Sequence, residues 1–320
     1  MQDKMWILYL CLGIVAFLWV LSWFIGAYSS FRMLLYRKSP EKWARGKPAR
    51  GKGVELAMFE AGCAWAKEHA NRKRDVHICH DGLDFYGEFF DFGGDQCVVI
   101  LPGRRDGLCD SYYYGIPYAQ KGWSVLVLDA RAHGLSGGEY CTVGFEEQGD
   151  NLAWVRFLEE ECGIRQVVFH GICIGCAGGL FAAVSEQCPE TVKGMVADGM
   201  YTTFAMSAFH HMRKYIIPAV PGLDILMIDY WVRRKLGHTI RFGPIHVIPQ
   251  LQLPLLMLHS REDRFSTPKQ AEKLFAACGS REKKLVWFDH GAHSQTRYSN
   301  QAEYDAAIGE FLENLSRVKV

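Results

Sequence analysis

The feature that most constrains how this chain can fold is an uncharged apolar segment of 27 residues, at positions 5–31. About 20 helical residues cross the ~30 Å hydrocarbon core of a bilayer, so this segment is long enough to span a membrane. Trp6, Trp23 and Tyr28 lie near its ends, where interfacial aromatic side chains gather. The sequence therefore predicts an N-terminal transmembrane anchor over residues 1–31.

The charges on either side of the segment predict its orientation. Lys4 precedes it and is offset by Asp3, whereas eight cations follow it: Arg32, Arg37, Lys38, Lys42, Arg45, Lys47, Arg50 and Lys52. Because positive residues stay on the cytoplasmic side, we expect a single-pass protein of the cell membrane whose larger part is cytoplasmic. Two alternatives stay open. One is a cleaved signal peptide, with Ala27-Tyr28-Ser29 as the cleavage site and a secreted product, and the other is a buried helix of a soluble protein.

The distribution of charge divides the chain into a basic N-terminal segment and a mildly acidic remainder. Residues 1–52 carry nine Lys and Arg against two Asp and Glu, and the other 268 residues carry 27 against 33. Residues 32–53 are expected to form a basic juxtamembrane linker that can rest on anionic lipid head groups, at about 1 kcal/mol per cation. The acidic remainder argues against nucleic-acid binding, which requires concentrated positive charge. The eleven cysteines show no framework-like spacing, as is typical of a reducing compartment.

From residue 54 onward, the pattern predicts an α/β domain that continues to residue 320. After a first helix at 54–69, residues 76–79 and 85–92 predict an antiparallel pair of strands joined at Asp81-Gly82. Short apolar segments that alternate with helical ones then predict a mostly parallel, doubly wound sheet, with strands at 97–101, 124–128, 166–170, 194–197, 254–258 and 284–288. Residues 200–248 interrupt this alternation and are interpreted as a cap insertion.

A candidate nucleophile lies where the central strand ends. Gly171-Ile172-Cys173-Ile174-Gly175 forms a G-x-C-x-G motif between a predicted strand and a predicted helix. A nucleophile on such a sharp turn needs close neighbours without side chains, hence glycine. The helix that follows directs its N-terminal amides at the same point, which favours a thiolate and later an oxyanion. The alternative for Cys173 alone is a small core thiol.

This turn resembles the nucleophile elbow of the α/β-hydrolase family. With three further motifs, the chain resembles that family over residues 73–316. Asp129-Ala130-Arg131-Ala132-His133-Gly134-Leu135-Ser136 matches the family's D-x-R-x-H-G-x-S turn. His259-Ser260-Arg261-Glu262-Asp263 follows a late strand, and Gly291-Ala292-His293-Ser294 follows the last one. The resemblance implies the α/β-hydrolase fold, with Cys173 as nucleophile, Asp263 as orienting acid and His293 as base. It also implies an oxyanion hole made by the backbone amides of Ile174 and Arg104, and neither a cofactor nor a metal.

The chain departs from the family pattern at several positions. Most members have serine in place of Cys173, although dienelactone hydrolases share the cysteine; Pro102-Gly103 replaces the usual His-Gly, and Ala132 replaces a glycine. Asp198 follows the preceding strand and is an alternative acid. His133 and Asp150 are interpreted as packing and capping residues.

These features predict a membrane-anchored hydrolase that cleaves an ester or thioester through a cysteinyl acyl intermediate. The apolar cap, with Leu226, Met227, Ile228 and Trp231 and with Ile216 and Ile217, suits an apolar or lipid-like acyl substrate. The alternative is a catalytically silent hydrolase fold that serves as a membrane-tethered binding or scaffold protein. Cys173 and Cys176 also form a C-x-x-C pair, so a disulfide that reversibly silences the nucleophile is a further hypothesis.

Overall fold

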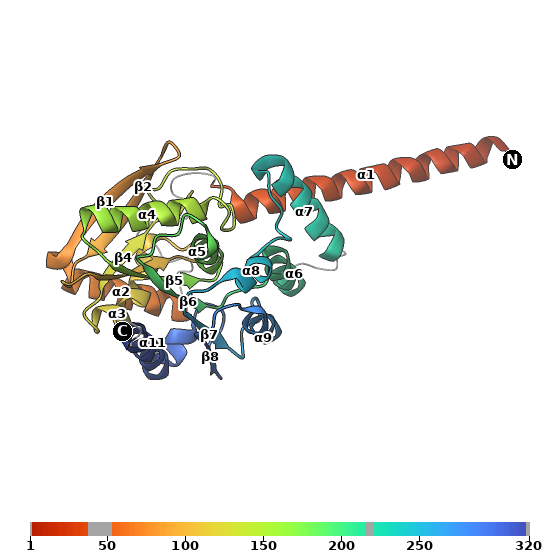
Figure 1. Cartoon of the computed structure of the whole chain (residues 1–320). Coiled ribbons are helices and arrows are strands. Elements are labelled where there is room, and N and C mark those ends of the chain that lie inside the picture. Colours follow the sequence, from red (N-terminus) through yellow and green to blue (C-terminus); the bar gives the residue numbers. More distant parts are fainter. Residues whose placement is uncertain (1, 38–52, 216–220, 318–320) are drawn as a thin grey trace.

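The computed structural model describes residues 2–37, 53–215 and 221–317, and its centre is an eight-stranded sheet (Figure 1). The strands are β1 (Lys73–His80), β2 (Leu83–Phe90), β3 (Gln96–Leu101), β4 (Ser124–Leu128), β5 (Gln166–Ile172), β6 (Val192–Asp198), β7 (Leu255–Ser260) and β8 (Lys283–Phe288). Their order is β1-β2-β4-β3-β5-β6-β7-β8. β2 pairs antiparallel with both β1 and β4, and every pair from β4 to β8 is parallel. The predicted hairpin and the predicted parallel sheet are therefore both present.

Helices cover both faces of the sheet (Figure 1). On one face lie α4 (Glu147–Glu161), α5 (Ile174–Val184) and α9 (Pro268–Ala277), and on the other lie α2 (Gly53–Glu68), α3 (Leu108–Ala119) and α11 (Gln301–Arg317). Successive side chains of a strand point to opposite faces, and in β3 Val99 packs under α4 and α5 whereas Val98 and Ile100 pack under α2 and α3. Burial on both faces explains why these strands are continuously apolar in the sequence.

The order of the strands places a crevice at the carboxyl ends of β3 and β5. The chain passes from β3 to β4 on one side, and it then crosses back to β5 on the other side of β3. In open α/β sheets, ligands bind at such a point, outside the carboxyl ends of the strands. α5 begins directly after β5, so the turn at Cys173 lies at this crevice.

The predicted cap insertion is helical. It contains α6 (Phe204–Tyr215), α7 (Pro221–Leu236), α8 (Pro244–Val247) and the 3-10 helix η2 (Ile248–Gln250). Apolar side chains of α6 and α7, among them Ala208, Ile225 and Ile228, share one buried cluster with Ile174 and Ala177 of α5. The cap therefore packs on the first turn of the helix that follows Cys173.

The N-terminal helix α1 (Gln2–Leu35) projects from the domain and runs past the predicted boundary at residue 31 (Figure 1). Ala27, Phe31, Leu34 and Leu35 are buried in the same cluster as the cap and the start of α5. Their spacing places them on one face of the helix, so the buried apolar face continues past Arg32, the first charged residue after the apolar segment. Residues 32–35, expected in the linker, are thus helical, and Leu34 and Leu35 are part of the core. Residues 38–52 of that basic linker lie outside the described residues.

Candidate active site

Cys173 lies on a strained turn at the end of β5. Its φ of 53° and ψ of −107° are unusual for a residue other than glycine. The backbone N–H of Cys173 donates to the carbonyl oxygen of Asp198 at 2.9 Å, which anchors the turn to the end of β6. The half-buried thiol stands at the N-terminus of α5, where the helix amides face it. Strain of this kind is typical of functional sites.

The two glycines of the motif are required because backbone segments approach closely. A Cβ atom on Gly171 would lie 2.6 Å from the backbone nitrogen of Cys176, and one on Gly175 would lie 2.1 Å from the carbonyl oxygen of Leu101. Neither glycine has a positive φ, so glycine is required because a side chain would not fit, and not because of the backbone conformation. α5 therefore packs its first turn directly against the end of β3.

Asp263 and His293 meet beside this turn. The Nδ1 atom of His293 lies 2.6 Å from Oδ2 of Asp263, and Oδ1 of Asp263 accepts backbone N–H groups of Phe265 at 2.8 Å and Ser266 at 2.9 Å. Burial opposes ionisation of Asp263, but the charge and hydrogen bond of His293, together with the backbone donor, hold the pKa of Asp263 below its ordinary value. The carboxylate therefore stays charged and orients the ring.

His293 also contacts Cys173. Burial disfavours the imidazolium, yet the charges of Asp263 and Cys173 and hydrogen bonds to both raise the pKa of His293 well above its ordinary value. Because Asp263 occupies Nδ1, Nε2 is the ring nitrogen left to accept the proton of the thiol. The structure thus brings together the three side chains that the sequence predicts as nucleophile, base and acid.

The alternative acid, Asp198, has different partners. Its Oδ2 accepts a hydrogen bond from the Tyr304 hydroxyl at 2.8 Å. The same hydroxyl contacts Nε2 of His170 at 3.2 Å, and the Tyr118 hydroxyl contacts Nδ1 of His170 at 3.1 Å. Burial raises the pKa of Asp198 to about 6, although Tyr304 opposes the shift. Asp198 thus ends a buried polar chain behind the site, while Asp263 holds His293.

The raised pKa of Asp198 predicts a stability effect that depends on pH. The folded state binds the proton of the Asp198 carboxyl group more tightly than the unfolded state does. The stability that this protonation contributes is therefore lost as pH rises from about 4 to 6. The free energy of unfolding of Asp198→Asn, relative to that of the wild type, should therefore rise across that window by at most about 3 kcal/mol. Urea unfolding of both proteins at pH 4, 5 and 7.5 measures the difference, with the exposed Asp289→Asn as the control for net charge. A difference that does not change with pH would contradict the prediction.

The loop between β3 and α3 faces Cys173, and His133 holds it in place. A Cβ atom on Gly103 would lie 3.8 Å from Cβ of Cys173, which places the backbone before Arg104 next to the thiol. Arg105, with a φ of 73°, donates its backbone N–H to Nε2 of His133 at 3.2 Å. Burial lowers the pKa of His133 to about 4, so the ring is neutral, donates from Nδ1 to the carbonyl of Arg131 and accepts at Nε2. His133 is therefore more than a packing residue, because it fixes the loop that carries the predicted oxyanion donor.

We accordingly expect His133→Ala to lower kcat by about 10²-fold, because a shift of about 1 Å in a site can cost that much. His133→Gln keeps an acceptor near the position of Nε2 and should restore most of the rate, with KM changed less than kcat in both variants. Steady-state kinetics on any substrate found for the wild type measures these values. Equal rates for the two variants would show that the hydrogen bond to Arg105 does not matter.

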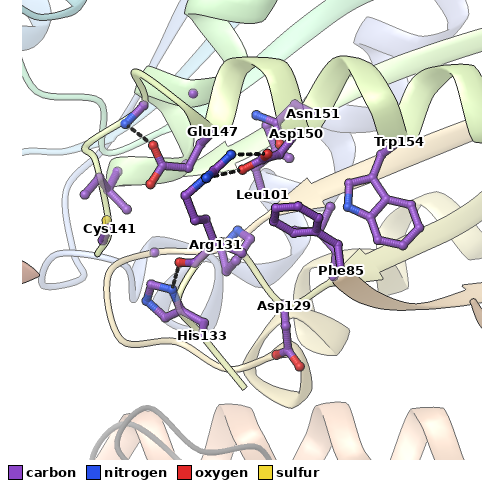
Figure 2. Close-up of a pocket in the computed structure, with 18 residues that line it drawn as sticks. Phe85, Leu101, Asp129, Arg131, His133, Cys141, Glu147, Asp150, Asn151 and Trp154 are labelled. Atoms are coloured by element: carbon purple, nitrogen blue, oxygen red, sulfur yellow. Dashed lines mark hydrogen bonds and ion pairs between the residues drawn. The ribbon is translucent and has the colours of Figure 1, made fainter. Parts of the chain in front are cut away.

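A small cavity of about 30 Å³ lies beside the turn that contains Arg131 and His133 (Figure 2). Figure 2 shows Arg131 reaching from the turn to α4, where its Nε donates to Asp150 at 2.9 Å and its Nη2 at 2.6 Å. Asp150 is therefore one half of a buried ion pair and not a capping residue. The cavity has room for about one or two water molecules, which excludes it as an acyl site. The ion pair ties the turn that carries His133 to the body of the domain.

Several residues near the site had no signal in the sequence. The carboxylate of Asp106 lies against Gly103, and burial raises its pKa to about 6, with Glu55 adding to the shift and His293 opposing it. The Tyr114 hydroxyl donates to the carbonyl of Ser294 at 2.7 Å, so α3 holds the loop of His293. These contacts join segments that are far apart in the chain, which a local pattern does not reveal.

The C-x-x-C pair consists of two free thiols. Cys176 is fully buried, and its Sγ lies 3.0 Å from the carbonyl oxygen of Gly171. Burial raises the pKa of Cys176 well above its ordinary value, so the thiolate needed for disulfide exchange is disfavoured. The disulfide between Cys173 and Cys176 therefore stays a hypothesis. Among the described residues, no group of three or more potential ligands could hold a metal ion.

Comparisons with known proteins support the fold. Residues 97–222 match a family described as alpha/beta hydrolase fold, and residues 246–297 match one described as serine aminopeptidase, S33. The uncharacterized protein YqkD of Bacillus subtilis is 27% identical over 222 residues, which cover 68% of this chain and 72% of that protein. The uncharacterized membrane protein YNL320W of Saccharomyces cerevisiae is 23% identical over 56% of this chain and 57% of its own length.

Solved structures show the same architecture. The esterase Pf2001 of Pyrococcus furiosus superposes with a TM-score of 0.65 and 22% identity, over 78% of this chain and 93% of its own. The alpha/beta hydrolase domain-containing protein 10 from mouse superposes with a TM-score of 0.56 and 15% identity, over 76% and 99%. The fold class predicted from the sequence is confirmed.

Proposed function

Because the chain has the α/β-hydrolase fold, we propose that it is an esterase or thioesterase that uses Cys173, His293 and Asp263 as a catalytic triad. The observation that carries the proposal is the His293 ring at the carboxyl edge of the sheet, which lies 2.6 Å from Asp263 and is near enough to Cys173 for that side chain to raise the pKa of His293. Nucleophile, base and orienting acid in this arrangement are what acyl transfer requires.

The proposed reaction proceeds in two halves. His293 accepts the proton of the Cys173 thiol, and the thiolate attacks the acyl carbonyl carbon to form a tetrahedral oxyanion. Backbone N–H groups of Ile174 and Arg104 hold this oxyanion, and His293 then protonates the departing alcohol or thiol. In the second half, His293 takes a proton from water, which attacks the acyl-cysteine and releases the carboxylic acid and the free thiol.

The surroundings of Cys173 favour an apolar acyl group. Cys173 packs against two apolar clusters, one of which contains Ile174, Tyr201 of the β6–α6 connection, and helices α6 and α7. Phe31 of α1 belongs to the same cluster, so the N-terminal helix contributes to this wall. An acyl chain lined by such side chains gains about 0.8 kcal/mol per buried CH₂ group.

We propose further that α1 anchors the enzyme in the cell membrane with the catalytic domain on the cytoplasmic side. Residues 5–35 form a helix long and apolar enough to cross a membrane, and its most apolar window is 0% buried against the domain. The cations that follow the apolar segment favour this orientation. The yeast relative is also named a membrane protein.

The test is a panel of medium- and long-chain esters and thioesters offered to the full chain in nanodiscs. The full chain is needed because the last turns of α1 are buried in the domain. Wild-type turnover that Cys173→Ala abolishes, with accumulation of an acyl adduct on Cys173, supports the proposal. Absence of turnover, with iodoacetamide labelling of Cys173 no faster than that of the other cysteines, favours the silent scaffold.

A further inference from the structure

The exposed length of α1 sets the height of the domain above the membrane. All 18 residues from position 5 to 22 are exposed, and the ring contacts between α1 and the domain start at Phe24. At 1.5 Å per residue the exposed part is about 27 Å long, close to the ~30 Å hydrocarbon core. This match places Phe24 and Tyr28 at the cytoplasmic interface of the membrane. The placement rests on the proposed membrane-spanning role of α1.

α7 lies beside α1 at this level (Figure 1). The ring centroid of Phe24 is 4.8 Å from that of Trp231 and 5.6 Å from that of Tyr230. The ring of Tyr28 is 4.6 Å from that of Trp231. A helix packed against the interfacial part of α1 must itself lie at the surface of the bilayer.

The outer face of α7 has the composition that this position requires. Leu226 is 47% exposed and Tyr230 is 49% exposed, and they lie on one face with Arg233, one turn apart. Arg234 and Lys235 continue the exposed surface in the last turn. Apolar and aromatic side chains followed by cations are typical of helices that lie in the interface of an anionic membrane.

We propose that α7 is a second membrane-contacting element, whose outer face rests on the head groups of the cytoplasmic leaflet. Leu226 and Tyr230 enter the interfacial region, and Arg234 and Lys235 contact anionic head groups. Two observations favour a lipid surface over a protein partner: the face is continuous with the exposed apolar part of α1, and its charge is complementary to anionic lipid. Since α7 shares a cluster with Ile174, the cap over Cys173 is held at the lipid surface.

The test replaces single residues of the full chain with the photo-crosslinking amino acid benzoylphenylalanine. The protein is placed in nanodiscs of mixed phosphatidylcholine and phosphatidylserine, and adducts are identified by mass spectrometry. Positions 226 and 230 should form lipid adducts, as should Leu18 in the exposed part of α1. The control is Tyr298, which is 44% exposed in α10 (Thr296–Ser299) beside α11 and should form none.

The outcomes separate this inference from the proposal on α1. Lipid adducts at Leu18 but none at positions 226 and 230, or protein adducts there, would overturn the role of α7 and leave the anchor intact. Absence of adducts at Leu18 as well would overturn both. With Arg234→Glu and Lys235→Glu combined, the adduct yield at position 230 should fall about fivefold or more in the mixed lipid, because each cation contributes about 1 kcal/mol. An unchanged yield would overturn the contact with anionic head groups.

Discussion

Replacing His293 with alanine is expected to lower kcat/KM for an acyl thioester or ester by about 10⁴-fold. The ring is held by the Asp263 carboxylate and is near enough to Cys173 for that side chain to raise the pKa of His293, so its removal takes away the proposed proton acceptor of the thiol. The oxyanion donors remain in place, so a residual rate above that of water should persist. Steady-state kinetics of the full chain in nanodiscs measures the loss, and iodoacetamide labelling of Cys173 should slow in parallel.

The same loop offers a matched control. His290 lies three residues earlier, its side chain is 76% exposed, and it contacts neither Cys173 nor Asp263 among the interactions of the described residues. His290→Ala should therefore keep both the turnover and the labelling rate of the wild type. If His293→Ala stays within tenfold of the wild type, the triad is wrong even if the protein is a hydrolase.

The parts of this structure that could be predicted from the sequence are those with a local physical cause. Residues 97–101 and 124–128 are continuously apolar because both of their faces are buried, and they form β3 and β4. The glycines around Cys173 are needed because α5 meets the end of β3, so the turn itself is visible in the sequence. The contact between Asp263 and His293 agrees with the pairing that the resemblance to the α/β-hydrolase family implied, while their catalytic roles remain a prediction.

The parts that could not be predicted depend on contacts between distant segments. Arg32 was taken as the end of the membrane segment, but its side chain is exposed while the neighbouring Phe31 and Leu34 are buried against the cap. The helix therefore continues through the charge, and the C-terminal end of the proposed anchor packs into the domain. In the same way, the acceptor role of His133 depends on a backbone N–H of a loop 28 residues away, which no local pattern indicates.

Replacing Gly175 with alanine should destabilise the fold by about 3 kcal/mol or more, at the upper end of the cost of overpacking. The new methyl group would lie 2.1 Å from the carbonyl oxygen of Leu101 and 2.8 Å from that of Pro102. Both atoms belong to the backbone at the end of strand β3, so no side-chain rotation can relieve the clash. Either α5 or the loop of Gly103 must move, and activity should fall together with stability.

Gly222, in the first turn of α7, is the control for this substitution. A Cβ atom there meets no atom of the described residues within 4 Å, and the φ angle is not positive. Gly222→Ala should therefore change stability by less than about 1 kcal/mol, with a small gain from helix propensity. Urea unfolding of the detergent-solubilised full chain compares the two variants with the wild type. Equal stability of Gly175→Ala and Gly222→Ala would mean that α5 does not touch the end of β3, and the turn that presents Cys173 would then lack its support.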